Sequence, residues 1–145
     1  MQVEKHIEAL QEVYETIEES LNDPKGLLGH QRRIASMASL GAQQLIEMYF
    51  HRLNIIKPGT QVKHEWLKSE EQNLRHRLSP ILTRNIAEIP NIQAILDLAN
   101  RIECDRNDIL YGAPLKEDKK LKEKIDNFLE LKKVTTEEKE IMPKI

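Results

Sequence analysis

Apolar residues recur at steps of three and four along most of the chain, and this spacing is the strongest constraint on its fold. Clear runs lie within residues 3–21, 34–53 and 92–109. Such steps place side chains on one face of an α-helix, whereas a strand would require strict alternation. The chain has only five glycines and six prolines, so few residues interrupt the runs. The sequence therefore predicts an all-α protein.

Turn-forming residues divide the chain into helical stretches. Asn22 to Gly26 and Lys57 to Thr60 are rich in Asn, Asp, Pro and Gly, and Gly112 precedes Pro114. Pro80 is expected to kink or split a helix, because proline removes a backbone donor and clashes with the preceding turn. The predicted architecture is an up-and-down helical bundle of about five helices, built around a long helical hairpin. The expected helices span residues 2–22, 27–54, 64–88, 91–111 and 116–133.

A length of 145 residues suits one domain. We predict a single helical bundle over residues 1–133 and a C-terminal tail over residues 134–145, where no pattern continues and disorder is expected. The N-terminus alternates charged and apolar residues, unlike a signal peptide, and no apolar run approaches the ~18 residues of a membrane span. We expect a cytoplasmic protein without a membrane segment. The single cysteine, Cys104, excludes an internal disulfide framework.

The net charge of −2 hides an uneven distribution. Residues 1–24 hold one Lys and seven Asp or Glu, whereas residues 25–85 hold ten Lys or Arg, four Asp or Glu, and four of the five histidines. A basic block of this kind can attract phosphate groups. The alternative is that the acidic first helix lies against the basic block, so that the two charges cancel.

The familiar phosphate and metal motifs are missing from the sequence. Neither GxxxxGK nor GxGxxG occurs, and there is no HExxH pattern or EF-hand loop. His64-Glu65 comes closest to a metal-binding pair, but no second ligand follows at helical spacing. We therefore expect no metal and no cofactor.

Arg106 stands where the apolar stripe of the helix predicted at 91–111 requires a hydrophobic residue. A guanidinium stays charged, and burying it without a partner is costly. One interpretation is a structural arginine, paired with a neighbouring carboxylate or a helix end. The other is an arginine at a cleft or a dimer seam, where its planar fork binds phosphate. The stripe consists of Ile92, Ile95, Ala99, Ile102, Arg106 and Ile109.

The residues after Arg106 add to this candidate site. Asn107 supplies an amide that can position a ligand, and Tyr111 lies one helical turn beyond Asn107. We expect Asn107 and Tyr111 to share a face of the helix. The carboxylates available to pair with Arg106 under the structural interpretation are Glu103, Asp105 and Asp108.

Three features of the chain, over roughly residues 25–131, resemble the HEPN domain family. The first is the long helix with small residues that ends in Leu45-Ile46-Glu47-Met48-Tyr49. The second is the loop Lys57-Pro58-Gly59-Thr60, followed by Lys63-His64-Glu65-Trp66-Leu67. The third is Arg106-Asn107, where the family carries an RN-x-x-x-H motif. The resemblance implies an all-α fold, and many members are dimeric, metal-independent ribonucleases.

Position 111 matches the histidine of that motif, and this chain has Tyr111 there. Histidine accepts and donates protons near neutral pH, whereas tyrosine hydroxyls titrate near pH ~10 and are poor bases. The resemblance therefore implies a homodimer that binds RNA or a nucleotide, with weak or lost ribonuclease activity. It places Arg106, Asn107 and Tyr111 at the catalytic position. The binding residues that we expect in addition are Lys63, His64, Arg75 and Arg77.

Two other functions stay open at this point. The chain could be an active metal-independent endoribonuclease of a toxin–antitoxin pair, in which Tyr111 or a nearby histidine such as His64 replaces the missing base and an antitoxin is the partner. It could also be a protein–protein interaction module without a ligand, using the acidic first helix and the charged fifth helix. A homodimer is expected because the modest core leaves the face around Arg106 in need of cover.

Overall fold

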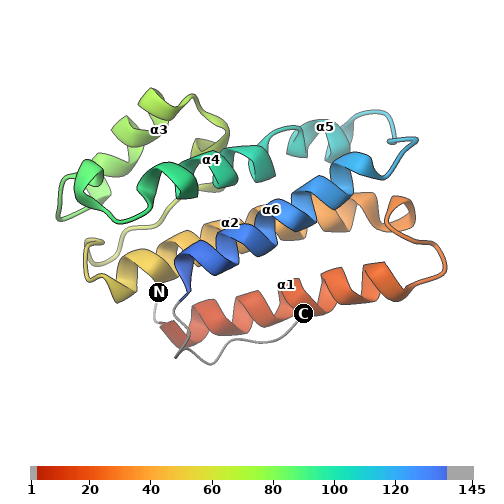
Figure 1. Cartoon of the computed structure of the whole chain (residues 1–145), viewed down its shortest axis with the longest axis horizontal. Coiled ribbons are helices and arrows are strands. Elements are labelled where there is room, and N and C mark those ends of the chain that lie inside the picture. Colours follow the sequence, from red (N-terminus) through yellow and green to blue (C-terminus); the bar gives the residue numbers. More distant parts are fainter. Residues whose placement is uncertain (1–2, 137–145) are drawn as a thin grey trace.

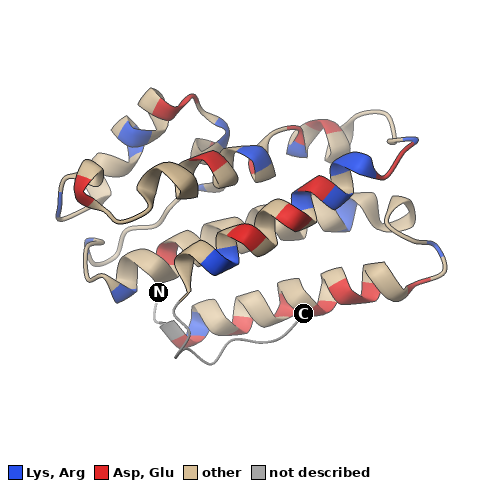
Figure 2. Cartoon of the chain, in the orientation of Figure 1, with Lys and Arg blue, Asp and Glu red and all other residues tan. Residues whose placement is uncertain are grey.

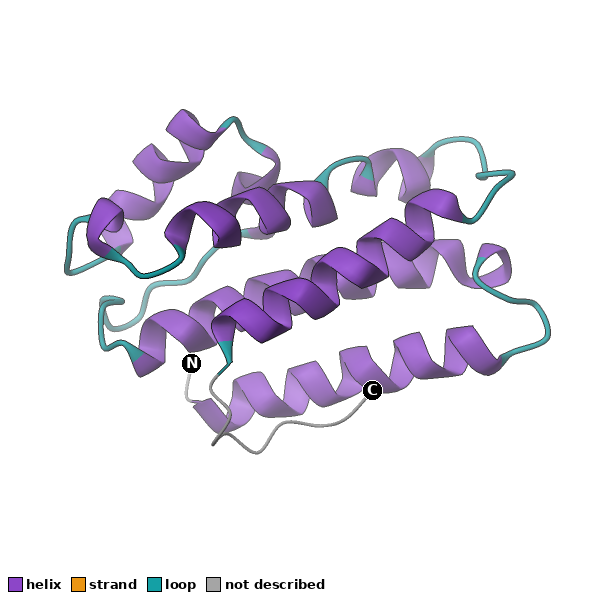
Figure 3. Ribbon diagram, viewed as in Figure 1, coloured by secondary structure: helices purple, strands orange, loops and turns teal. Residues whose placement is uncertain are grey.

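The computed structural model describes residues 3–136 of the chain, and this part is a bundle of packed helices (Figures 1 and 3). The predicted fold class is therefore confirmed. No strand occurs in residues 3–136, where an isolated bridge joins Ile56 to Leu82. No helix in this range is both long enough and apolar enough to cross a membrane. The α-helices are α1 (Val3–Asn22), α2 (Gln31–Arg52), α3 (Glu71–Leu78), α4 (Ile92–Glu103), α5 (Arg106–Tyr111) and α6 (Lys119–Thr135).

The central helix of the bundle is α2, as its small residues suggest. It packs against α1, α4, α5 and α6, and Figure 1 shows it running through the middle of the molecule. Gly41 permits one of these contacts, because the ring of Phe128 in α6 occupies the space that a Cβ atom at position 41 would need. Close packing thus compensates for a glycine inside a helix.

Several predicted boundaries differ from the observed ones. Residues 64–88 form separate short helices, and Pro80 lies inside one of them, so the expected split at this proline is confirmed. The last helix, α6, continues to Thr135, which is buried, and therefore includes the first residues of the predicted tail. The rest of that tail, residues 137–145, lies outside the described residues. The short 3₁₀ helices are η1 (Leu28–His30), η2 (His64–Lys68), η3 (Ser79–Ile81) and η4 (Ile86–Glu88).

The prediction of one helix over residues 91–111 is wrong. α4 ends at Glu103 and α5 begins at Arg106, because Asp105 between them has a φ of 65°. This left-handed conformation ends a right-handed helix. Arg106 is consequently the first residue of a new helix and does not continue the apolar stripe of α4. The spacing concealed the break because Ile102 and Ile109 are both buried, each on its own helix.

The acidic helix α1 lies along α2, which carries part of the basic block. Acidic residues recur along α1 in Figure 2, and Arg33 of α2 pairs with Glu19 of α1 at 3.2 Å. Other cations of the block, including Lys63, Lys68 and Arg77, are exposed and lie outside α2. Packing of α1 on α2 therefore leaves a substantial part of the basic block open to solvent.

Candidate functional site

The break between α4 and α5 creates the candidate site. The turn at Asp105 leaves a pocket of about 270 Å³. Two neighbouring pockets of about 440 and 520 Å³ extend toward α3 and α6, and Cys104 lines all three. We call the smallest one the junction pocket. Its lining residues are Lys68, Glu103, Cys104, Asp105, Arg106, Asn107 and Asp108.

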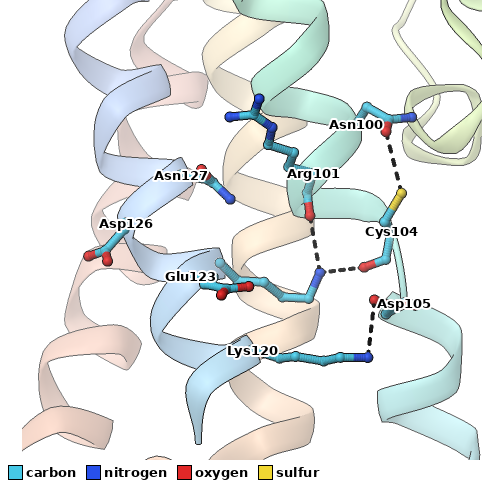
Figure 4. Close-up of a pocket in the computed structure, with 9 residues that line it drawn as sticks. Asn100, Arg101, Cys104, Asp105, Lys120, Glu123, Asp126 and Asn127 are labelled. Atoms are coloured by element: carbon cyan, nitrogen blue, oxygen red, sulfur yellow. Dashed lines mark hydrogen bonds and ion pairs between the residues drawn. The ribbon is translucent and has the colours of Figure 1, made fainter.

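Lys124 of α6 holds the break in place, near the ion pair of Lys120 with Asp105 that Figure 4 shows. Its ammonium donates to the carbonyl oxygens of Ile102 at 2.8 Å and Arg101 at 3.4 Å, and also to that of Cys104. Carbonyls at a helix C-terminus lack partners within the helix and favour a cation. Burial lowers the pKa of Lys124, and the nearby acidic groups, Asp105 foremost, oppose that shift. α6 thus fixes the turn that presents Arg106.

Arg106 is half-buried and forms no ion pair with another described residue. Its Nη1 donates to Oδ1 of Asn107 at 2.9 Å, while its Nε is shielded from solvent and has no hydrogen-bond partner within residues 3–136. Asp105 pairs instead with Lys120, at 3.4 Å. The structure therefore does not show the structural salt bridge that the sequence left open. It places the guanidinium in the wall of a pocket.

Glu103, which the sequence offered only as a carboxylate partner of Arg106, has other partners in the structure. This last residue of α4 is only 4% exposed, and both of its carboxylate oxygens are engaged. Ser39 Oγ of α2 donates to Oε2 at 2.5 Å, and His64 Nδ1 of η2 lies 2.8 Å from Oε1. The sequence did not reveal this group of contacts, because its three residues are far apart in the chain and meet only when α2, α4 and η2 pack together.

The contact with Glu103 sets the chemistry of His64. A carboxylate oxygen that accepts from Nδ1 favours the tautomer with its hydrogen on that nitrogen, and in the neutral ring Nε2 then keeps its lone pair. Nε2 lies 3.6 Å from Oε1 of Glu65, and the His64 side chain is 31% exposed. An imidazole oriented by a buried carboxylate, with its second nitrogen accessible, is suited to proton transfer.

The other predicted site residues lie outside the junction pocket. Tyr111 is 81% exposed at the end of α5, and Lys63 is exposed just before η2. Arg75 on α3 is engaged by Glu71 at 3.0 Å and by Gln93 at 3.1 Å, and Arg77 is exposed on the same helix. α3 and α5 lie near different ends of α4 in Figure 1. The structure therefore brings together Arg106 and Asn107, whereas His64 contacts Glu103 and lines none of the three pockets.

A second buried glutamate, Glu47, is found farther along α2 and is 2% exposed. Its Oε1 accepts the backbone N–H of Val62 at 2.6 Å, and its Oε2 lies 3.9 Å from Nε2 of His6. The Nδ1 atom of His6 lies 2.7 Å from Oε1 of Gln44. Burial raises the pKa of Glu47, and the bond from Val62 acts against that shift. These residues line none of the three pockets described above.

No group of three or more His, Cys, Asp or Glu side chains within residues 3–136 is arranged to hold a metal ion. Comparisons of the chain with protein families, with curated proteins and with solved structures find no match. The site is therefore interpreted from its own geometry.

Proposed function

We propose that the protein binds single-stranded RNA, or a nucleotide, at the junction pocket. The observation that supports this most strongly is the guanidinium of Arg106, which lines the pocket without an ion-pair partner in the described chain. A guanidinium in this state can bind two phosphate oxygens at once. Lys68 lines the same pocket and adds a second cation, and the exposed Lys63 precedes the helix that carries Lys68.

The mixed charge of the pocket favours a ribonucleotide within a strand over a small phosphate dianion. Glu103, Asp105 and Asp108 line the same pocket as the two cations, and their negative charge disfavours a doubly charged phosphate. A phosphodiester carries only one negative charge, and the neighbouring ribose has a 2′-hydroxyl that can donate to a carboxylate. The side-chain amide of Asn107 can both donate to and accept from a base edge.

A homodimer is part of this proposal. The exposed ring of Tyr111 stands at the end of the same short helix that begins with Arg106. Exposed aromatic residues commonly anchor protein interfaces or stack on bases. The HEPN resemblance assigns the corresponding position to a seam between two copies. Family membership, a cytoplasmic location and an antitoxin partner stay hypotheses, and light scattering of the purified protein would test the dimer directly.

The test of binding uses Arg106→Ala and a fluorescently labelled single-stranded RNA followed by anisotropy. Losing a bidentate phosphate contact should weaken affinity roughly ten- to hundred-fold, and wild-type affinity should fall as salt is raised. Arg77→Ala is the matched control, because Arg77 is an exposed arginine outside the pocket. Unchanged affinity of Arg106→Ala would reject the proposal. Equal losses in both variants would assign binding to a diffuse basic surface instead.

A further inference from the structure

We propose that the break between α4 and α5 is a two-state element, and that Lys124 holds it in the bent form that contains the junction pocket. In the other form, residues 92–111 make one continuous helix and the pocket is lost. The inference concerns regulation of the candidate site, so its effect on RNA affinity rests on the proposed function. The two-state element itself has a readout that needs no RNA.

The first support is the set of backbone atoms that Lys124 binds. Its buried ammonium donates to the carbonyl oxygens of Arg101, Ile102 and Cys104. In a continuous helix, the same three carbonyls would accept the N–H groups four residues further along the chain. Lys124 therefore takes the place of the helical hydrogen bonds that the break removes, and without its ammonium these carbonyls would be satisfied by a continuous helix.

The second support is the local sequence at the break. Asp105 has a φ of 65°, a conformation that is less favourable for a residue with a Cβ atom than for glycine. Neither glycine nor proline occurs within residues 92–111, and the helical spacing of Ile102 and Ile109 continues across the turn. The local sequence thus favours a continuous helix. α6 opposes it through Lys124 and through the ion pair of Lys120 with Asp105 (Figure 4).

The position of Arg106 differs between the two forms. In the bent form it lines the junction pocket. In a continuous helix it would share a face with Ile102 and Ile109, which are both buried, and would leave the pocket wall. Burying a guanidinium is costly, so the bent form is the ground state while Lys124 binds the carbonyls. RNA that binds Arg106 stabilises the bent form, and the population of that form sets the apparent affinity.

The experiment compares wild type with Lys124→Met, which removes the ammonium but keeps a long apolar side chain. The first readout is hydrogen exchange, by NMR, of the backbone amides of Asn107 and Asp108, which lack an acceptor within α5. The second is the Kd for labelled single-stranded RNA. Carbonyls left without donors should shift the equilibrium toward the continuous helix by roughly a hundredfold. Both amides should then exchange more slowly, and the Kd should rise at least about threefold. Lys122→Met, at an exposed lysine of α6, should behave like wild type.

Substitutions at Asp105 test the same equilibrium from the other side. Glycine adopts a positive φ without steric cost and is unfavourable inside a helix. Adding Asp105→Gly to Lys124→Met should therefore restore fast amide exchange and lower the Kd at least about threefold. Asp105→Ala alone favours a continuous helix and should slow the exchange. If Lys124 only stabilised the fold, glycine at position 105 would not reverse the effect of its loss, and that result would reject the proposal.

The outcomes separate the switch from the proposed function. Unchanged amide exchange in Lys124→Met overturns the two-state element, whatever the RNA affinity of this variant. A wild-type protein that does not bind RNA overturns the proposed function, and amide exchange then decides on the two-state element alone. If Lys124→Met does not fold, as judged by circular dichroism, Asp105→Ala replaces it. Slower exchange of Asn107 and Asp108 in that variant supports the proposal, and unchanged exchange rejects it.

Discussion

The two buried glutamates of this bundle have similar surroundings but different relations to solvent. Glu47 and Glu103 are 2% and 4% exposed, and each lies beside a histidine from another element. The histidine next to Glu47 is His6, which is fully buried, whereas the histidine next to Glu103 is His64, which is 31% exposed. Only Glu103 lines a pocket that contains an arginine without an ion-pair partner in the described chain.

This difference indicates that burial of a carboxylate does not by itself identify a functional site. Glu47 accepts a backbone N–H from the loop that follows α2, and Gln43 donates to the carbonyl of the same residue, Val62, at 2.6 Å. The Glu47 network therefore fastens a loop to a helix. Glu103 holds a side chain whose other nitrogen is accessible, so its network presents a reactive group. The accessibility of the histidine decides between the two roles.

The largest expected effect is on stability, when Glu47 and Glu103 are each replaced by leucine. Glu47→Leu leaves the buried N–H of Val62 without an acceptor and should lower the free energy of unfolding by about 1 to 3 kcal/mol. Glu103→Leu should lower it less, because His64 can turn toward water and Ser39 can bond to a carbonyl one turn back. Removing a negative charge from the C-terminus of α4 also offsets part of the loss.

Urea denaturation of the two variants measures this difference, and RNA affinity is measured alongside it. Glu47→Leu should bind RNA as wild type does under conditions where it is folded. The comparison fails if Glu103→Leu is the less stable of the two, or if Glu47→Leu loses RNA affinity.

A smaller change in stability is expected for Glu103→Gln. The amide can donate to Nδ1 of His64, which moves the ring hydrogen to Nε2 and removes the lone pair. Stability should fall by about 1 kcal/mol or less, while the Kd for single-stranded RNA stays within about twofold, because phosphate contacts dominate affinity. Urea denaturation measures the loss of stability, and fluorescence anisotropy with labelled RNA measures the Kd.

A different result would contradict this expectation for Glu103. It fails if Glu103→Gln is as unstable as Glu103→Leu, or if it loses RNA affinity. Ser39→Ala provides the matched control, since it removes one hydrogen bond to Glu103 but leaves the charge and the contact with His64.

The fold was largely predictable from the sequence because helical periodicity is a local property. The runs around Val13, Leu45 and Ile125 each predict a buried face, and all three residues are buried. The break at Asp105 was not predictable in this way. The steps of three and four residues continue across it, and neither glycine nor proline marks the turn. The left-handed conformation there is stabilised by contacts from α6, which the local pattern does not contain.

The candidate site was predictable only in part, for a related reason. Arg106 stood out because a charge interrupted an apparent apolar stripe, and it does line a pocket, although the stripe itself was misassigned. Ser39 carried no signal, since a serine among small residues is common, and Glu103 was named only as a possible partner of Arg106. Their meeting with His64 depends on three elements separated by up to 64 positions in the chain.

The smallest expected effect is a pH dependence of stability at the Glu47 network. His51 packs against His6 with ring centroids 5.3 Å apart, and the pKa of His51 is lowered, mainly by burial and further by repulsion from His6. A depressed pKa in the folded state means that the fold favours neutral His51. The contribution of His51 to stability is therefore present above pH 6.5, the ordinary pKa of histidine, and is lost as the pH falls below that value.

Glu47, whose pKa is raised mainly by burial, works in the opposite direction at lower pH, so wild type alone does not isolate His51. The difference in unfolding free energy between wild type and His51→Gln isolates the contribution of His51. This difference should shrink as the pH is lowered from 7.5 to 5.5. A difference that does not change with pH would show that His51 titrates equally in both states. Of these two groups, Glu47 alone would then link the stability of this network to pH.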